Sequence, residues 1–127
     1  MFFSFLFGKK SGNKTAKPET KENISREWKN IQVLLNGKSP SQLRQALISA
    51  DKCVDNALKD FVDGETMGER LKNADNLFDR DLYNKIWDAH KVRNTLVHEV
   101  GYEPPHFLVT QSVESFRKGL NSLGITL

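Results

Sequence analysis

The stretch SPSQLRQALISADKCVDNALKDFVDG, residues 39–64, decides the fold of this chain. Its apolar side chains recur every three or four positions, which places them on one face of a helix. They are Leu43, Leu47, Ala50, Val54, Ala57, Leu58 and Phe61. Ser39 and Pro40 are typical of an N-cap and a first helical turn, and Asp63-Gly64 is typical of a stop. The stretch therefore predicts one long amphipathic helix that packs against other helices.

Four further helices follow from the same spacing in the flanking sequence. The expected ranges are 24–37, 66–78, 82–99 and 105–123. The range 66–78 should open with a capping box, in which the Thr66 hydroxyl and the Glu69 carboxylate each accept a main-chain N–H. Pro104 and Pro105 separate the last two helices, because consecutive prolines end one helix and suit the start of the next. No alternating segment indicates a strand, so we expect an all-α fold, a small helical bundle of about five helices.

Length and composition indicate one domain. A chain of 127 residues with 38% hydrophobic residues can bury a core without disulfides or metals. Its single cysteine, Cys53, lies in the helical stripe and is expected to be a packed core thiol. No apolar run approaches the length of about 20 residues that a membrane-spanning helix needs. We therefore expect a cytoplasmic protein.

The net charge of +3 comes from one end of the chain. Residues 1–23 hold five lysines and two glutamates, whereas basic and acidic residues balance in the remainder. We therefore divide the chain into residues 1–23, an aromatic-basic N-terminal tail and linker, and residues 24–127, the helical domain. Residues 9–23 are polar and lack apolar periodicity, which predicts a disordered linker. Since the domain is neutral, any nucleic-acid site on it must be local.

The first residues, MFFSFLFG, form a short aromatic cluster before Lys9 and Lys10. A secretory signal has the reverse order, with positive charge before a longer apolar segment. One interpretation is a weak anchor, in which residues 1–10 make the protein peripheral to a membrane through aromatic rings and lysines. The other is a terminus that frays or packs on itself. Both interpretations stay open at this point.

The segment KVRNTLVHEV, residues 91–100, carries an arginine on an apolar helix face. On a helical wheel with 100° per residue, Arg93 lies about 20° from Leu82, in the middle of that face. The apolar residues around it are Leu82, Ile86, Ala89, Leu96, Val97 and Val100. Asn94 and His98 lie on a polar and aromatic flank that also carries Trp87 and His90. A guanidinium on an apolar face needs a partner, because it does not lose its charge.

Two kinds of partner can satisfy Arg93. One is an internal ion pair, for which Asp51, Asp55 and Asp75 are the candidate carboxylates. The other is an anionic ligand. His98 likewise is either a polar edge residue or an acid–base group. A zinc site is not expected, because the three histidines are each eight residues apart and prolines interrupt the helix before the third.

Arg93-Asn94-Thr95-Leu96-Val97-His98 resembles the Arg-x4-His motif of the HEPN domains (higher eukaryote and prokaryote nucleotide-binding), including a polar residue after the arginine. The motif lies near the end of a late helix, and LISADKCVDNALKDF, residues 47–61, is similar to the long helix of such domains. The resemblance covers about residues 41–122. It implies an all-helical bundle that forms a homodimer, with the motifs of two chains facing each other across a cleft.

The resemblance also implies a function, a metal-independent endoribonuclease of toxin or defence type that needs no cofactor. Arg93 would bind the scissile phosphate, Asn94 would orient the phosphate or the histidine, and His98 would move protons during attack by the ribose 2′-hydroxyl. The RNA products would carry 2′,3′-cyclic phosphate and 5′-hydroxyl ends. A nucleotidyltransferase-type antitoxin is the implied protein partner.

A second function remains open, because the family also contains members that do not cleave RNA. In that case the chain is a non-catalytic module that binds a nucleotide or a protein. Its binding surface would be the dimer cleft or the flank formed by Trp87 and His90.

Overall fold

The computed structural model describes residues 14–127. The aromatic cluster, and with it the membrane contact predicted for residues 1–10, lies outside the described residues. The elements are α1 (Pro18–Gly37), α2 (Pro40–Leu58), α3 (Met67–Asn73), the 3-10 turn η2 (Asp75–Leu77), α4 (Arg80–His98) and α5 (His106–Ser122). Strands are absent from residues 14–127. The prediction of an all-α bundle of about five helices is confirmed.

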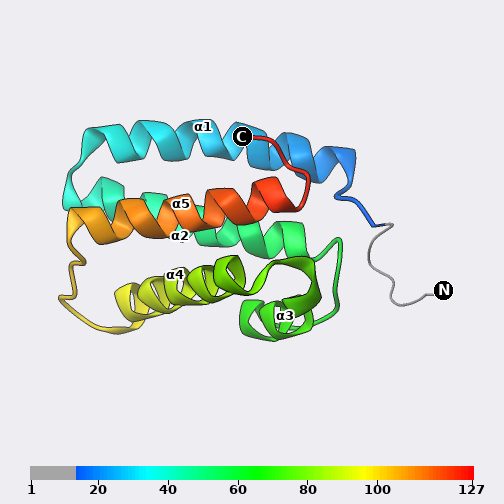
Figure 1. The fold of residues 1–127 in the computed structure, drawn as a ribbon. Helices are drawn as coiled ribbons and strands as arrows, with labels where there is room; N and C mark the ends of the chain where they lie inside the picture. The colour runs from blue at the N-terminus through cyan, green and yellow to red at the C-terminus, as the bar shows by residue number, and fades with distance from the viewer. Residues whose placement is uncertain (1–13) are drawn as a thin grey trace.

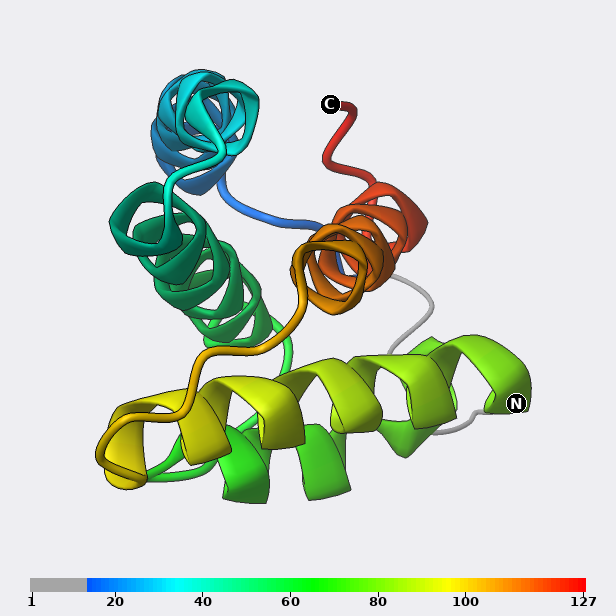
Figure 2. The ribbon, with the colours of Figure 1, turned by 90° about the vertical axis from the view of Figure 1, so that its left-hand side faces the viewer.

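The long helix α2 lies at the centre of the bundle and contacts α1, α4 and α5 (Figures 1 and 2). Figure 2 shows α1, α2 and α5 nearly end-on, with α4 crossing beneath α2 and α5. The short helix α3 is fixed to α4 by the buried Tyr83 hydroxyl, which donates to the Leu71 carbonyl at 2.9 Å. Side chains with almost no exposed surface fill the space between these helices, among them Leu47, Leu58, Ile86, Leu96, Phe116 and Leu120.

The start of α2 has the residues expected for it. Ser39 is the N-cap, Pro40 is the first helical residue, and the predicted apolar stripe is buried. The Ser39 hydroxyl accepts from the Gln42 N–H at 3.2 Å, and the Gln42 side chain accepts from the Ser39 N–H at 3.2 Å. This reciprocal capping box satisfies two main-chain donors that would otherwise have no partner.

The linker prediction is wrong for residues 18–23, because α1 begins at Pro18 instead of residue 24. Contacts with the end of α2 explain the earlier start. The Lys17 main-chain N–H donates to Asp60 at 2.9 Å, and the Lys14 ammonium donates to the Phe61 carbonyl at 3.0 Å. Ala16 between them is buried. Residues 14–17 therefore bind to the bundle, and a proline in the first turn then starts the helix.

The range 66–78 is not one helix, since α3 ends at Asn73 and η2 follows it. Half of the predicted capping box is present, because the Thr66 hydroxyl accepts from the Glu69 N–H at 3.1 Å. The other half differs, because the Glu69 carboxylate accepts from the N–H of Glu65 and not from that of Thr66. The N-terminal cap of α3 therefore extends one residue further into the preceding loop, to Glu65.

Candidate functional site

A buried pair of ionisable side chains joins α2 to α4 where the two helices cross. Asp51 of α2 and His90 of α4 are 4% and 6% exposed, and the His90 Nδ1 lies 2.6 Å from the Asp51 Oδ2. The Asn94 amide nitrogen lies 3.4 Å from the other ring nitrogen, Nε2. These contacts fit a neutral imidazole that donates from Nδ1 and accepts at Nε2. Asp51 therefore has a strong hydrogen-bond partner in a site that excludes water.

Arg93 lies beside this pair but is not hydrogen-bonded to it. Its Nε is 3.7 Å from the Asp51 Oδ1, which is beyond hydrogen-bond distance, and this buried Nε has no hydrogen-bond partner. Its Nη1 donates to the Asn94 Oδ1 at 3.0 Å, and the side chain is 30% exposed. One part of the guanidinium is therefore held by the protein while another part reaches solvent.

Of the three carboxylates predicted as partners for Arg93, Asp51 is the one that the structure places beside it. Asp55, one turn later on α2, pairs instead with Arg70 of α3, with Nε–Oδ1 at 2.6 Å and Nη2–Oδ2 at 3.1 Å. The hydrogen bonds that Arg70 donates to Asp55 raise the pKa of Arg70 further above its usual value. Asp75 is exposed in η2. Of the three alternatives, Asp51 therefore fits, whereas Asp55 and Asp75 do not.

His98 is the last residue of α4 and is exposed. Within residues 14–127 no hydrogen bond or ion pair joins its side chain to another residue. One chain thus brings Arg93 and Asn94 together and leaves His98 apart from them. This agrees with helix geometry, since five residues correspond to a rise of about 7.5 Å and a separation of about 140° around the axis.

His90, which the wheel placed on the polar and aromatic flank of α4, is a further residue of the site. It is buried, and the neighbouring half-buried Trp87 ring packs edge-on against it at 6.0 Å between centroids. The predicted binding flank is therefore largely internal. A signal for the pair does exist in the sequence, because Asp51 continues the register of Leu47 and Val54, and His90 that of Ile86. Two polar residues in core register are expected to be partners.

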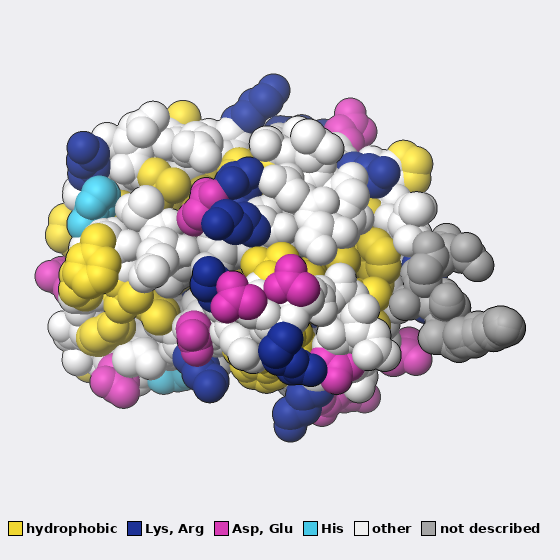
Figure 3. Space-filling view, viewed as in Figure 1, with side chains coloured by type: hydrophobic (Ala, Val, Ile, Leu, Met, Phe, Trp, Pro, Cys, Tyr) yellow, Lys and Arg dark blue, Asp and Glu magenta, His cyan; other side chains and the backbone are white. Residues whose placement is uncertain are grey.

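The end of α4 also differs from the predicted apolar face. Val97 is 39% exposed and Val100 is fully exposed, although both were expected in the core. The helix ends at His98, and the following loop leads to α5, where Phe107 is 70% exposed. Figure 3 shows hydrophobic side chains gathered on the side of the molecule where α5 begins. We call Val97, Val100 and Phe107 the apolar end patch.

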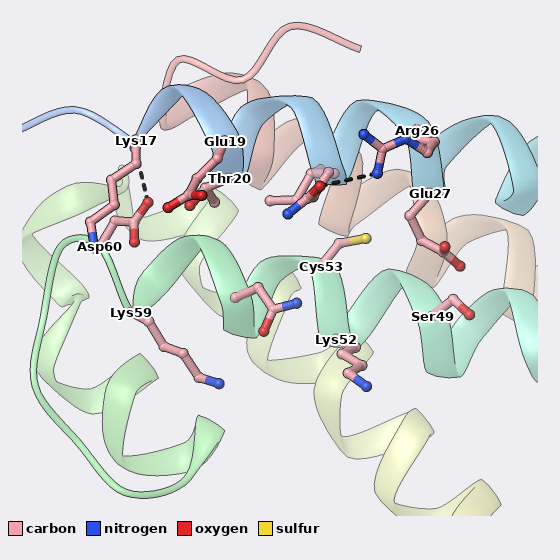
Figure 4. A pocket seen from close by; sticks show the side chains of 13 residues that line it. Lys17, Glu19, Thr20, Arg26, Glu27, Ser49, Lys52, Cys53, Lys59 and Asp60 are labelled. Carbon is pink, nitrogen blue, oxygen red and sulfur yellow. Dashed lines mark hydrogen bonds between the residues drawn. The ribbon is translucent and has the colours of Figure 1, made fainter.

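A separate groove of about 710 Å³ lies between α1 and α2 (Figure 4). Side chains of both charge signs line it, and Lys17 and Asp60 are joined across its end. Cys53 lies in this groove, where burial raises the pKa of its thiol to about 12. At neutral pH the group therefore stays a thiol, which is neither a good nucleophile nor a metal ligand. Among residues 14–127, no three His, Cys, Asp or Glu side chains gather as a metal site.

Fold and site together define a small helical-bundle protein with a half-exposed arginine supported by a buried Asp–His pair. Comparison with known proteins gives no matching family model, curated protein or solved structure. No helix in residues 14–127 is long and apolar enough to cross a membrane.

Proposed function

We propose that this chain is a HEPN-type endoribonuclease that cleaves single-stranded RNA as a homodimer and without a metal ion. The observation that carries the proposal is the state of Arg93 within the Arg-x4-His motif. Its guanidinium is held in place by Asn94 and lies near Asp51, yet it keeps exposed surface and lacks a carboxylate hydrogen bond. A cation kept in this state is available to a phosphate.

Arg93 would bind the scissile phosphate and stabilise the charge that grows on its oxygens in the transition state. Beside it, the buried Asp51 is hydrogen-bonded to His90 through Oδ2, while its Oδ1 lies 3.7 Å from the Arg93 Nε. The carboxylate therefore attracts the guanidinium without holding it by a hydrogen bond. Asn94 contacts both Arg93 and His90, so it would fix the direction of the guanidinium.

His98 would provide the proton transfers. In the first half of the reaction, an imidazole takes the proton of the ribose 2′-hydroxyl while its oxygen bonds to phosphorus. The bond from phosphorus to the 5′-oxygen then breaks, and that oxygen receives a proton from a second imidazole. The products are a 2′,3′-cyclic phosphate and a 5′-hydroxyl. His98 is exposed, as a group that exchanges protons with a substrate must be.

A homodimer would supply the second imidazole and place His98 of one copy near Arg93 of the other. One chain presents the two groups on different sides of α4, whereas two copies can present them to a single phosphate. The apolar end patch supports this arrangement, because Val97 and Val100 flank His98 in the sequence and are exposed. Covering such a patch with a second copy removes apolar surface from water.

As a toxin, such an enzyme would act on cytoplasmic RNA and be held inactive by an antitoxin of nucleotidyltransferase type. A second candidate function is a non-catalytic module that binds a nucleotide or a protein. The specific observation in favour of a protein-binding module is the 3.7 Å approach of Asp51 to Arg93, since a nearby carboxylate competes for the cation with a phosphate of RNA or of a nucleotide.

The test is cleavage of a labelled single-stranded RNA by the purified protein in EDTA, with product ends assigned by mass spectrometry. We expect cleavage to a 2′,3′-cyclic phosphate, and its loss in His98→Ala. Lys91→Ala removes another exposed polar side chain of α4 and is the matched control, which should keep full activity. Absence of cleavage by the native protein, or equal cleavage by His98→Ala, rejects the nuclease and leaves the binding module.

A further inference from the structure

A second cavity lies at the end of the bundle, between the start of α2, the last turn of α4 and the loop that leads to α5. Figure 2 shows this loop passing from the end of α4 to the start of α5 beside the start of α2. The cavity has a volume of about 690 Å³, which is in the range of small-molecule sites. None of the three residues assigned to RNA cleavage lines it.

The cavity combines an apolar floor with a basic rim. Leu43, Leu96 and Val109 are buried at its floor, and the half-buried ring of Tyr102 contributes an aromatic wall. The rim residues are Lys38 from the turn before α2, Arg44 from α2, His106 from α5, and one acid, Glu103. None of these rim side chains forms an ion pair or a side-chain hydrogen bond within residues 14–127.

The number of acidic side chains at this rim is smaller than in the groove between α1 and α2, although the two have the same formal net charge. In that groove three acidic side chains accompany four basic ones, and the Asp60 carboxylate accepts a hydrogen bond from the Lys17 main-chain N–H. In the end cavity two permanent cations and a histidine face a single acid, so fewer carboxylates compete with a bound anion there. The end cavity is therefore the one of the two that is suited to an anion.

The backbone at Lys38 adds an independent observation. Its φ of 64° lies in the left-handed region, which glycine adopts at much lower cost than lysine. The turn nevertheless places a lysine side chain at the mouth of the cavity. Lys38 is the left-handed cap that ends α1, and the same turn sets its side chain beside the cavity.

We propose that the end cavity binds a nucleoside monophosphate, with the phosphate at Lys38 and Arg44 and the base against Tyr102. Arg44 can offer two parallel N–H donors to phosphate oxygens, and a phenol ring is a stacking surface for any base. The ligand can be a free nucleotide or the terminal nucleotide of a strand. This inference does not depend on the proposed RNA cleavage, because it concerns binding at different residues.

Isothermal titration calorimetry of the full chain tests the proposal with three probes. These are uridine 5′-monophosphate, uridine, and a 5′-phosphorylated tetradeoxynucleotide, which lacks the 2′-hydroxyl needed for cleavage. We expect saturable binding of one or both phosphorylated probes and weaker binding of uridine. Binding of the tetranucleotide alone identifies a strand end as the ligand, and similar binding of the mononucleotide identifies a free nucleotide.

Variants then assign the binding to the cavity. Arg44→Ala should weaken it by about tenfold or more, as loss of a charged hydrogen-bond donor does. Tyr102→Ala should weaken it as well, whereas Tyr102→Phe keeps the ring and should bind normally. Arg26→Ala removes an exposed arginine of α1 and is the charge-matched control. Thermal melting checks that each variant is folded.

Three results overturn the proposal. They are no saturable binding of either phosphorylated probe, equal weakening by Arg44→Ala and Arg26→Ala, and equal affinity for uridine and its monophosphate. A native protein that fails to cleave RNA but binds these probes rejects the nuclease and supports the cavity. A protein that cleaves RNA but does not bind these probes supports the nuclease and rejects the nucleotide site in the cavity.

Discussion

Two arginines lie beside two aspartates that are one turn apart on α2, and the surroundings of the two guanidinium groups differ. Arg70 makes two hydrogen bonds to Asp55 and a third to the Gly64 carbonyl, and its side chain is 9% exposed. Arg93 approaches Asp51 to 3.7 Å without a hydrogen bond and is 30% exposed. Asp51 is hydrogen-bonded to His90 through Oδ2, and its Oδ1, the oxygen nearest to Arg93, lies beyond hydrogen-bond distance of the guanidinium. A fully satisfied arginine stabilises the fold, whereas a partly satisfied one can bind a ligand.

The largest expected effect is on cleavage by Arg93→Ala. Removing one group that stabilises transition-state charge costs about 100- to 1000-fold in rate. The change in stability should be small, about 1 kcal/mol or less, because Asp51 keeps its bond to His90. Rate measurements under saturating RNA and urea unfolding check the two parts. Cleavage equal to that of Arg26→Ala, or a large loss of stability, would show that Arg93 is a structural residue like Arg70.

Arg70→Ala should show the opposite behaviour. It leaves the partly buried Asp55 carboxylate and the Gly64 carbonyl without their donors, so we expect a loss of about 3 kcal/mol in the free energy of unfolding. Cleavage by the folded fraction should be unchanged, because Arg70 is remote from the motif in the sequence and pairs with a different aspartate. Urea titration gives the stability, and activity is normalised to the folded fraction. A loss below about 1 kcal/mol would contradict the contrast between the two pairs.

The helices were predictable to the extent that local rules determine them. The stripe of α2 and its N-cap depend on residues three or four apart, and the structure confirms them. The predicted end near Asp63-Gly64 is wrong, because the helix ends at Leu58. The start of α1 was not predictable, because it depends on Asp60, a residue more than 40 positions away, binding the Lys17 N–H. The exposure of Val97 and Val100 depends on where the loop after His98 directs the chain. A helical wheel assigns each residue to a face of its helix, but it does not show how far along that face the neighbouring helices extend.

In the candidate site, too, some features follow from local helix geometry and others depend on the tertiary structure. The wheel gave correctly the separation of Arg93 from His98, since it follows from helix geometry alone. The choice of Asp51 over Asp55 depends on how α2 crosses α4 and α3, because the two aspartates lie on the same helix face. The burial of His90 depends on that crossing too. Which of several helix faces is covered is a property of the tertiary structure.

An effect of intermediate size is expected when His90, which shares Asp51 with Arg93, is replaced. Asp51 is then left to Arg93, as Asp55 is to Arg70. His90→Ala deprives the buried Asp51 Oδ2 of its hydrogen bond, and we expect a loss of about 2 kcal/mol in the free energy of unfolding. The free carboxylate should then attract Arg93 more strongly and reduce cleavage. His90→Asn, which keeps a donor, should lose less of both. If His90→Ala is as stable and as active as the native protein, the Asp51–His90 pair does not support Arg93.

The smallest expected effect is at a third arginine–carboxylate pair, on the surface of α5. Arg117 donates two hydrogen bonds to Glu114, which lower the pKa of that carboxyl below its usual value. A lowered folded-state pKa contributes stability above the unfolded pKa, near 4.5, and this contribution is lost as pH falls through the folded value. Because both side chains are substantially exposed, Arg117→Ala should cost only about 0.3 kcal/mol at pH 7. Urea unfolding at several pH values measures the difference, which should shrink toward zero in acid. A difference that instead grows in acid, or that approaches the cost of Arg70→Ala, would mean that burial does not distinguish these pairs.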